Sequence, residues 1–302
     1  SSGVVEMSGG GPRVMRLLDL ADDDARGAQS AILRAFRLFL LFHVATRTWF
    51  WFLREPHDDT AFRVTLAALL TLCALLAVRP GWQRRATVAA LAVLACKLVD
   101  SFPSTSNHFF IEILCVALLA AFDLESGEER ALCLVTLRWV VVLVLFWTGL
   151  QKVLYGTYFD GQFLGFSIAT RASFADLFQW ILPAAEIDRL RGLRPIGVGS
   201  GPFAFQSPLG WLVSNGVYVF EIVAPALLLV RRTRPWAAVA VIAFTALIEI
   251  GAREFLFGAL FVNLLLLFFA RPVNRALLPA FALFYVWMIG VRLGWLPTVA
   301  FN

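Results

Sequence analysis

The chain has 302 residues, of which 60% are hydrophobic and only 16% are charged, and its mean hydropathy is +0.76. A soluble domain is about 45–50% apolar and about 25% charged, so this composition excludes an ordinary soluble enzyme. The formal net charge is +5, but the basic residues lie in short clusters between apolar blocks, which is typical of membrane topology rather than phosphate recognition. We therefore expect a lipid bilayer as the environment and no nucleic-acid partner.

The first segment of the chain differs from the rest. Residues 1–28 are polar and glycine-rich, and they lack the short apolar core of a signal peptide. We predict that they form a mobile cytoplasmic tail, with a short interfacial helix at residues 14–20. Residues 29–302 are predicted to form a single transmembrane domain.

Apolar blocks of about 17–25 residues follow this tail, and that length crosses the hydrocarbon layer of a bilayer, which is about 30 Å thick. They predict an all-α, polytopic transmembrane helix bundle. The expected spans number about nine, at residues 30–53, 61–78, 85–102, 107–123, 130–154, 209–230, 235–251, 254–270 and 276–295.

The arginine clusters predict the orientation of the bundle through the positive-inside rule. If the N-terminus is cytoplasmic, the basic turns at residues 79–85, 231–234 and 271–275 also fall inside. The acidic turn at 123–129 falls inside too, but acidic residues count for little in this rule. Nine spans then place the C-terminus outside.

A long segment, residues 156–208, is predicted to lie outside and is too long for a plain connector. Residues 174–182 predict an amphipathic helix, in which Trp180 suits the headgroup layer. Residues 189–201 are rich in arginine and glycine and are expected to be irregular. This outer loop is either a lid over a cavity that opens outward or a surface loop that lies on the bilayer.

No metal site is expected. The four cysteines lie inside apolar blocks without a CxxC or Cys/His spacing, at Cys73, Cys96, Cys115 and Cys133.

Ionisable groups inside spans cost free energy, so they line a site or pair with one another. In the predicted orientation nearly all of them fall in the outer half of the membrane. They are His43, Arg47, Lys97, Asp100, His108, Glu112, Lys152, Glu221, Glu249, Arg253 and Glu254. This clustering predicts a polar cavity beneath the outer surface; the alternative is a set of pairs that hold helices together or reach the interface.

Lysine is rare in this chain, since only Lys97 and Lys152 among the 26 basic residues are lysine. Arginine keeps its proton, whereas a desolvated lysine can become a neutral base. Lys152 is therefore a candidate base. Lys97 is a weaker candidate, because an ion pair with Asp100 three residues later also explains it.

Four motifs carry a resemblance to a known family. Residues 106–110 (SNHFF), 146–153 (FWTGLQKV) and 158–161 (YFDG) occur in order, and 219–225 (VFEIVAP) precedes an arginine-rich turn. Together they resemble the vitamin K-dependent gamma-carboxylases and their bacterial relatives, the HTTM (horizontally transferred transmembrane) proteins. The similarity covers residues 30–290.

The resemblance implies a gamma-glutamyl carboxylase-like lyase or ligase that uses a vitamin K-type hydroquinone. Lys152 would deprotonate the hydroquinone, oxygen would turn the anion into a strong base, and that base would remove a gamma proton from a peptide glutamate before CO2 is added. His108, next to Asn107, would hydrogen-bond the quinone oxygen or the carbanion. Independently of the resemblance, Glu112 lies one helical turn after His108 on the same face and is expected to orient it. Glu249 stands where the carboxylases have a histidine.

The other expected supporting residues are Glu221, Arg47 and Lys97. Gln151 replaces a second lysine of the family's helix, and the luminal domain that binds the carboxylase propeptide is not expected here. Quinone chemistry is thus a firmer expectation than peptide carboxylation.

Two other functions remain open. The chain could be a non-catalytic accessory or maturation subunit of a membrane complex, which would bind other subunits or a peptide. A transporter is less favoured, because polar residues are scarce in the inner half of the spans. The arginine-rich, alanine- and leucine-rich composition indicates a GC-rich bacterial genome, and hence a multi-pass protein of the bacterial plasma (inner) membrane.

Overall fold

The computed structural model describes residues 26–54, 60–193 and 202–296. Each segment predicted to span the membrane is a helix there. These helices are α2 (Arg26–Arg54), α3 (Thr60–Ala77), α4 (Gln83–Ser101), α5 (Asn107–Ala121), α6 (Gly127–Tyr155), α10 (Pro208–Leu229), α11 (Arg234–Ala252), α12 (Phe255–Leu266) and α13 (Val273–Arg292), and a 3-10 turn, η1 (Pro80–Trp82), precedes α4. Most of the predicted tail, including its helix at 14–20, lies outside the described residues, and residues 26–28 already belong to α2.

The helices differ in whether they can cross a bilayer alone. Within the described ranges six are long and apolar enough, namely α2, α3, α6, α10, α11 and α13. α5 and α12 are apolar but shorter, and a helix such as α12, with 12 residues, is only about 18 Å long. The chain is thus an all-helical, multi-pass membrane protein, while nine crossings and the cytoplasmic N-terminus remain predictions.

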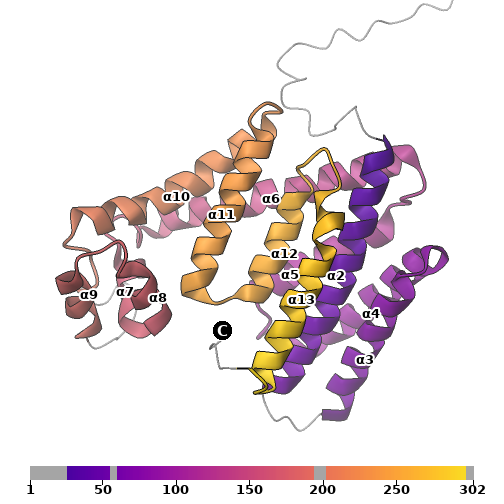
Figure 1. Ribbon diagram of the computed structural model, residues 1–302, viewed down its shortest axis with the longest axis horizontal. Coiled ribbons are helices and arrows are strands. Elements are labelled where there is room, and N and C mark those ends of the chain that lie inside the picture. Colours follow the sequence, from indigo (N-terminus) through magenta and orange to yellow (C-terminus); the bar gives the residue numbers. More distant parts are fainter. Residues whose placement is uncertain (1–25, 55–59, 194–201, 297–302) are drawn as a thin grey trace, which may run out of the picture.

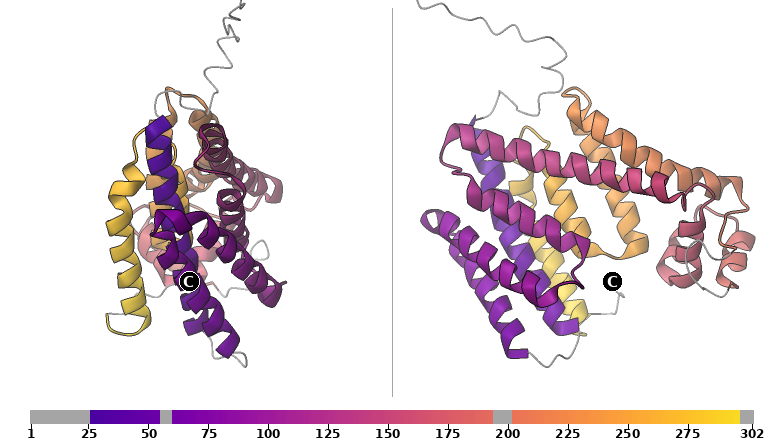
Figure 2. Two further views of the ribbon diagram at one scale, coloured as in Figure 1. Left: turned by 90° about the vertical axis from the view of Figure 1, so that its right-hand side faces the viewer. Right: turned by 180° about the vertical axis from the view of Figure 1, so that it is seen from behind.

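Two groups of helices build the bundle. α2 is central to the first group, because it contacts α3, α4, α5, α6, α12 and α13. Figure 1 shows it between α13 and α4. α6 and α10 form a pair along most of their length, and Figure 2 shows them side by side on the opposite face, tilted away from the direction of α2.

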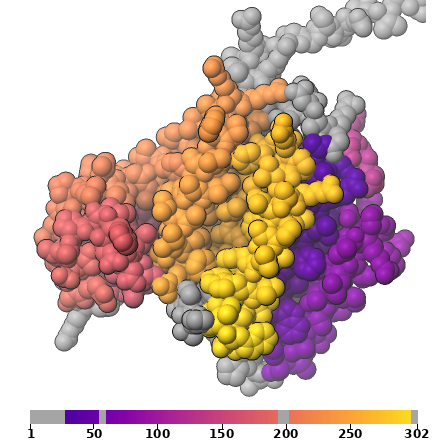
Figure 3. Space-filling view, in the orientation of Figure 1, coloured from indigo at the N-terminus to yellow at the C-terminus, as the bar shows by residue number. Residues whose placement is uncertain are grey.

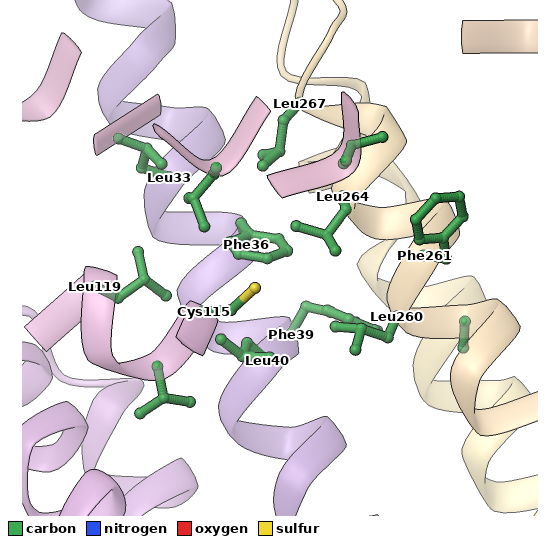
Figure 4. Packing of buried hydrophobic residues seen from close by; sticks show 14 of the residues in the cluster. Leu33, Phe36, Phe39, Leu40, Cys115, Leu119, Leu260, Phe261, Leu264 and Leu267 are labelled. Atoms are coloured by element: carbon green, nitrogen blue, oxygen red, sulfur yellow. The ribbon is translucent and has the colours of Figure 1, made fainter. Parts of the chain in front are cut away.

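The core of the bundle lies where α2, α5 and α12 meet. Figure 4 shows Phe36 and Leu40 of α2 facing Cys115 of α5 and the leucines Leu260 and Leu264 of α12. All five side chains are buried without measurable exposure. The two helices too short to cross the membrane are therefore held by packing on the long central helix.

Three buried arginines close helix ends. The last carbonyls of a helix have no partner within it and carry partial negative charge, and in each case a guanidinium group donates to one of them. The bonds run from Arg37 Nη2 to Leu119 O (3.1 Å), from Arg138 Nε to Leu267 O (2.9 Å) and from Arg234 Nε to Leu228 O (3.1 Å). In Figure 1, α10 and α12 end at the upper side of the bundle, where α2 begins.

The predicted outer loop contains three short helices rather than one. They are α7 (Gln162–Thr170), α8 (Ala172–Phe178) and α9 (Ala184–Arg191), and we call residues 156–193 and 202–207 the outer unit. The unit has its own core, which includes Ile168, Phe178 and Leu190. Figure 3 shows it as a lobe beside α11.

The outer unit corrects two predictions made from the sequence. The helix expected at 174–182 is α8, which ends at Phe178, and residues 189–191 are helical rather than irregular. Trp180 is 85% exposed, as an interfacial residue would be. The unit is fixed to the bundle where Ser173 Oγ donates to Gly251 O at 2.6 Å, so α8 covers the end of α11.

Candidate functional site

A lysine and a glutamate from two apolar helices form a close ion pair among the candidate residues. Lys152 Nζ of α6 lies 2.6 Å from both carboxylate oxygens of Glu221 in α10. The two side chains are 16% and 5% exposed. The ammonium also lies 5.2 Å from the ring centre of Tyr158. We call this contact the Lys152–Glu221 pair.

The sequence positions this pair through a glycine. A Cβ on Gly149 would lie only 2.8 Å from Ile222 Cγ1 and 3.0 Å from Glu221 Cβ. Small residues let membrane helices approach closely, and here the missing side chain brings α6 against α10. Lys152 is three residues beyond Gly149, which places it on the same face of α6.

A second cluster lies at the turn between α11 and α12. His108 Nε2 donates to Glu254 Oε2 at 3.0 Å, and the His108 ring stacks on Phe257 with 4.0 Å between ring centres. The side chains of His108 and Glu254 are 32% and 40% exposed. Glu249 is buried nearby, and its Oε2 has no hydrogen-bond partner among the residues that the structure describes.

The expectation that Glu112 orients His108 is wrong. Glu112 Oε1 instead contacts His43 Nε2 at 3.0 Å and also binds Arg47. Although both residues lie near the start of α5, Glu112 is buried against α2, whereas His108 meets α12. Asn107, the first residue of α5, is exposed.

The Glu112 contacts belong to a third, almost fully buried cluster. His43 Nδ1 lies 2.7 Å from Tyr285 Oη, so a hydrogen-bonded series links α13, α2 and α5. Lys97 Nζ donates to Thr48 Oγ1 at 2.9 Å instead of pairing with Asp100, which is exposed. The ring of Phe109 lies 4.8 Å from that ammonium.

The predicted site residues therefore form three clusters rather than one. Lys152 and His108 have different partners, and no hydrogen bond joins them within the described part of the chain. One hollow lies beside Arg37 and Asp123, and another is an apolar groove along Leu283 and Trp295. Neither is lined by the candidate base.

The sequence reasoning missed three partners. Thr48 and Tyr285 were not singled out, although Tyr285 is a polar residue within an apolar segment. Glu254 was recognised as an ionisable group but not as the partner of His108. The position of Glu254, directly after the end of α11, could have indicated this contact. A residue in a turn between two helices faces the ends of the neighbouring helices on the same side of the bundle.

Comparison with known proteins adds no assignment. No protein-family profile, no curated protein and no solved structure matches the chain. The resemblance to the gamma-carboxylases and HTTM proteins thus rests on the motifs around His108, Lys152 and Glu221.

Those motifs occupy two of the three clusters. His108 and Lys152 are each partly exposed, whereas in the third cluster His43 and Glu112 are enclosed and Arg47 reaches the edge. Proton transfer to or from a substrate requires contact with it. The Lys152–Glu221 pair and the His108 cluster are accordingly the candidates for chemistry, and the third cluster holds α2, α4, α5 and α13 together.

Proposed function

We propose that this membrane protein is an enzyme similar to the vitamin K-dependent gamma-carboxylases. In it Lys152 is the base that takes a proton from a lipophilic hydroxyl group, such as that of a reduced membrane quinone. The observation that carries the proposal is the Lys152–Glu221 pair, in which both carboxylate oxygens lie 2.6 Å from the ammonium.

Stability alone does not explain a buried ion pair, because apolar residues of similar size often stabilise a fold just as much. Its chemistry offers another reason for its presence. Glu221 can accept one ammonium proton along the short hydrogen bond, which leaves a neutral amine on Lys152. That amine can then take the proton of a bound hydroxyl, so the net transfer is from substrate to Glu221. An arginine at position 152 would keep its proton.

The surroundings of Lys152 fit an aromatic substrate from the lipid phase. The ring of Tyr158 faces the ammonium, and Trp147, Tyr155 and Phe159 are exposed around the same end of α6. Aromatic rings pack favourably on one another. When bound, a reduced quinone would supply the acidic hydroxyl and the electrons for reaction with oxygen.

The test uses purified protein in liposomes with reduced vitamin K or menaquinol, oxygen and labelled bicarbonate. Quinol oxidation and incorporation of label into glutamate-containing peptides are measured separately. Lys152→Ala should lower quinol oxidation at least about 100-fold, because positioned bases contribute about 10²–10⁴-fold. Lys152→Arg should be equally inactive. Arg191→Ala, which removes an exposed cation, is the control and should retain activity.

A charge-swapped variant separates chemistry from helix pairing. Lys152→Glu combined with Glu221→Lys keeps an ion pair between α6 and α10 but moves the amine to the other helix. A catalytic lysine predicts a folded, inactive protein. Full activity in the swapped variant or in Lys152→Ala would contradict the proposal.

The same contact favours a second candidate, a non-catalytic subunit of a membrane complex, because Lys152 and Glu221 satisfy each other's charge. In that case wild-type protein oxidises no quinol. The single substitutions would lower the yield of folded protein, and the charge swap would restore it.

A further inference from the structure

His108 is held on two sides by α12. Its Nε2 atom donates to Glu254 Oε2, and its ring stacks on Phe257 with an interplanar angle of 23°. The Nδ1 atom has no hydrogen-bond partner among the residues that the structure describes, and the side chain is one third exposed. One ring nitrogen is therefore fixed, and the other remains available.

The backbone explains why Glu254 is free to reach His108. α11 ends at Ala252, and the next residue, Arg253, has a left-handed conformation with φ of +58°, which turns the chain toward α12. Glu254 then occupies the N-cap position of α12, but its side chain makes no capping bond to that helix. Its backbone carbonyl accepts from Gly258 N at 3.1 Å, so the turn is fixed while the carboxylate faces α5.

Neighbouring groups keep this carboxylate in place. Arg171, at the start of α8, and Arg47 of α2 both interact electrostatically with Glu254. Glu249, one turn earlier, lies against Gly258.

We propose that Glu254 is the positioning residue of His108. By accepting the Nε2–H bond, it selects the tautomer in which Nδ1 carries the lone pair. In a carboxylate–histidine pair, the bond at one nitrogen decides which state the other presents. The catalytic consequence, a His108 that accepts a hydrogen bond from substrate through Nδ1, rests on the proposed function. The hydrogen bond between His108 and Glu254 does not depend on the proposed function.

The first experiment needs no activity. The chain contains three histidines, so nitrogen-15 histidine spectra of the whole protein in detergent micelles can be assigned with His43→Gln and His57→Gln. The His108 Nε2–H proton should resonate downfield and exchange slowly in the wild type. In Glu254→Ala it should move upfield and exchange at least tenfold faster. Glu128→Gln, an exposed carboxylate on α6, should change nothing.

The second experiment measures kinetics in the quinol assay. Glu254→Gln should lower kcat about tenfold or more with little change in KM, and Glu254→Asp should recover part of the loss, because only a carboxylate holds the ring firmly. Equal effects on kcat and KM, with no rescue by aspartate, would indicate a general structural role and overturn the proposal.

The two arms separate the possible failures. A His108 proton that is unaffected by Glu254→Ala overturns the positioning role, whatever the activity. If the His108 proton responds to Glu254→Ala but the wild-type protein does not oxidise quinol, the positioning of His108 is supported and the proposed function is rejected.

Discussion

Outside the transmembrane helices, one carboxylate organises the outer unit. Glu186 Oε1 accepts hydrogen bonds from Arg189 Nη2 at 2.8 Å and from the backbone N–H of Gln206 at 2.9 Å. Burial acts to raise the pKa of Glu186, but these bonds to its charged form outweigh it and hold the pKa below the usual value. Glu186 thereby ties α9 to the segment that leads into α10.

This depressed pKa predicts a loss of local stability in acid. A carboxylate with a lowered folded-state pKa contributes stability above its unfolded value, about 4.3 for glutamate, and loses it as the pH falls through the folded value. Amide hydrogen exchange of α9, corrected for intrinsic rates, should therefore accelerate below about pH 4.

The matched variants are Glu186→Gln and Asp188→Asn. Glu186→Gln should exchange fast already at neutral pH and lose the acid dependence, whereas Asp188, which is exposed, should be replaceable without effect. Identical profiles for all three proteins would contradict the assigned role.

At this scale the sequence singled out ionisable residues that do form polar contacts, but it did not show which residues meet. A spacing of three or four identifies neighbours on the same helix, and it suggested His108 with Glu112 and Lys97 with Asp100. The structure pairs these residues across helices instead, with Glu254, His43 and Thr48. Contacts between helices depend on how each helix is rotated about its own axis, and a local sequence pattern does not determine that rotation.

Among the helices, the close approach of α6 and α10 depends on Gly149. Gly149→Leu should force the helices apart, disrupt the Lys152–Glu221 pair and destabilise the protein by about 1–3 kcal/mol, the usual cost of overpacking. Thermal unfolding in detergent measures this change.

Gly216 provides the control within the same pair of helices. A Cβ there would meet nothing within 4 Å, so Gly216→Leu should leave stability unchanged or raise it, since leucine favours helix more than glycine does. If both leucine variants melt alike, packing at Gly149 is not the determinant.

Long apolar helices could be predicted from the sequence because their length and composition reflect the bilayer itself. The short helices α7 and α9 could not, since they have nine and eight residues, and helices of that length are stable only through tertiary packing. Leu164 and Ile187 are buried in the core of the outer unit, and this contact exists only after the segment has folded back on itself.

For the whole molecule, the arginine-rich turns predict that the end where α2 begins is cytoplasmic. The test is cysteine labelling in intact cells with a membrane-impermeant maleimide, in a Cys96→Ser background, because Cys96 is exposed whereas the other cysteines are buried. Trp180→Cys should label from outside, and Arg232→Cys only after permeabilisation. The reverse pattern would show the opposite orientation.

The buried arginines at the helix ends have a consequence for biogenesis if that orientation holds. During insertion, cationic side chains keep their flank of a span on the cytoplasmic side. Arg37, Arg138 and Arg234 then become enclosed by the helices whose last carbonyls they bind. Reversing a span would require breaking these bonds and carrying a guanidinium through hydrocarbon. Packing would thus make the choice of orientation permanent, so that an initially dynamic insertion becomes irreversible once the bundle closes.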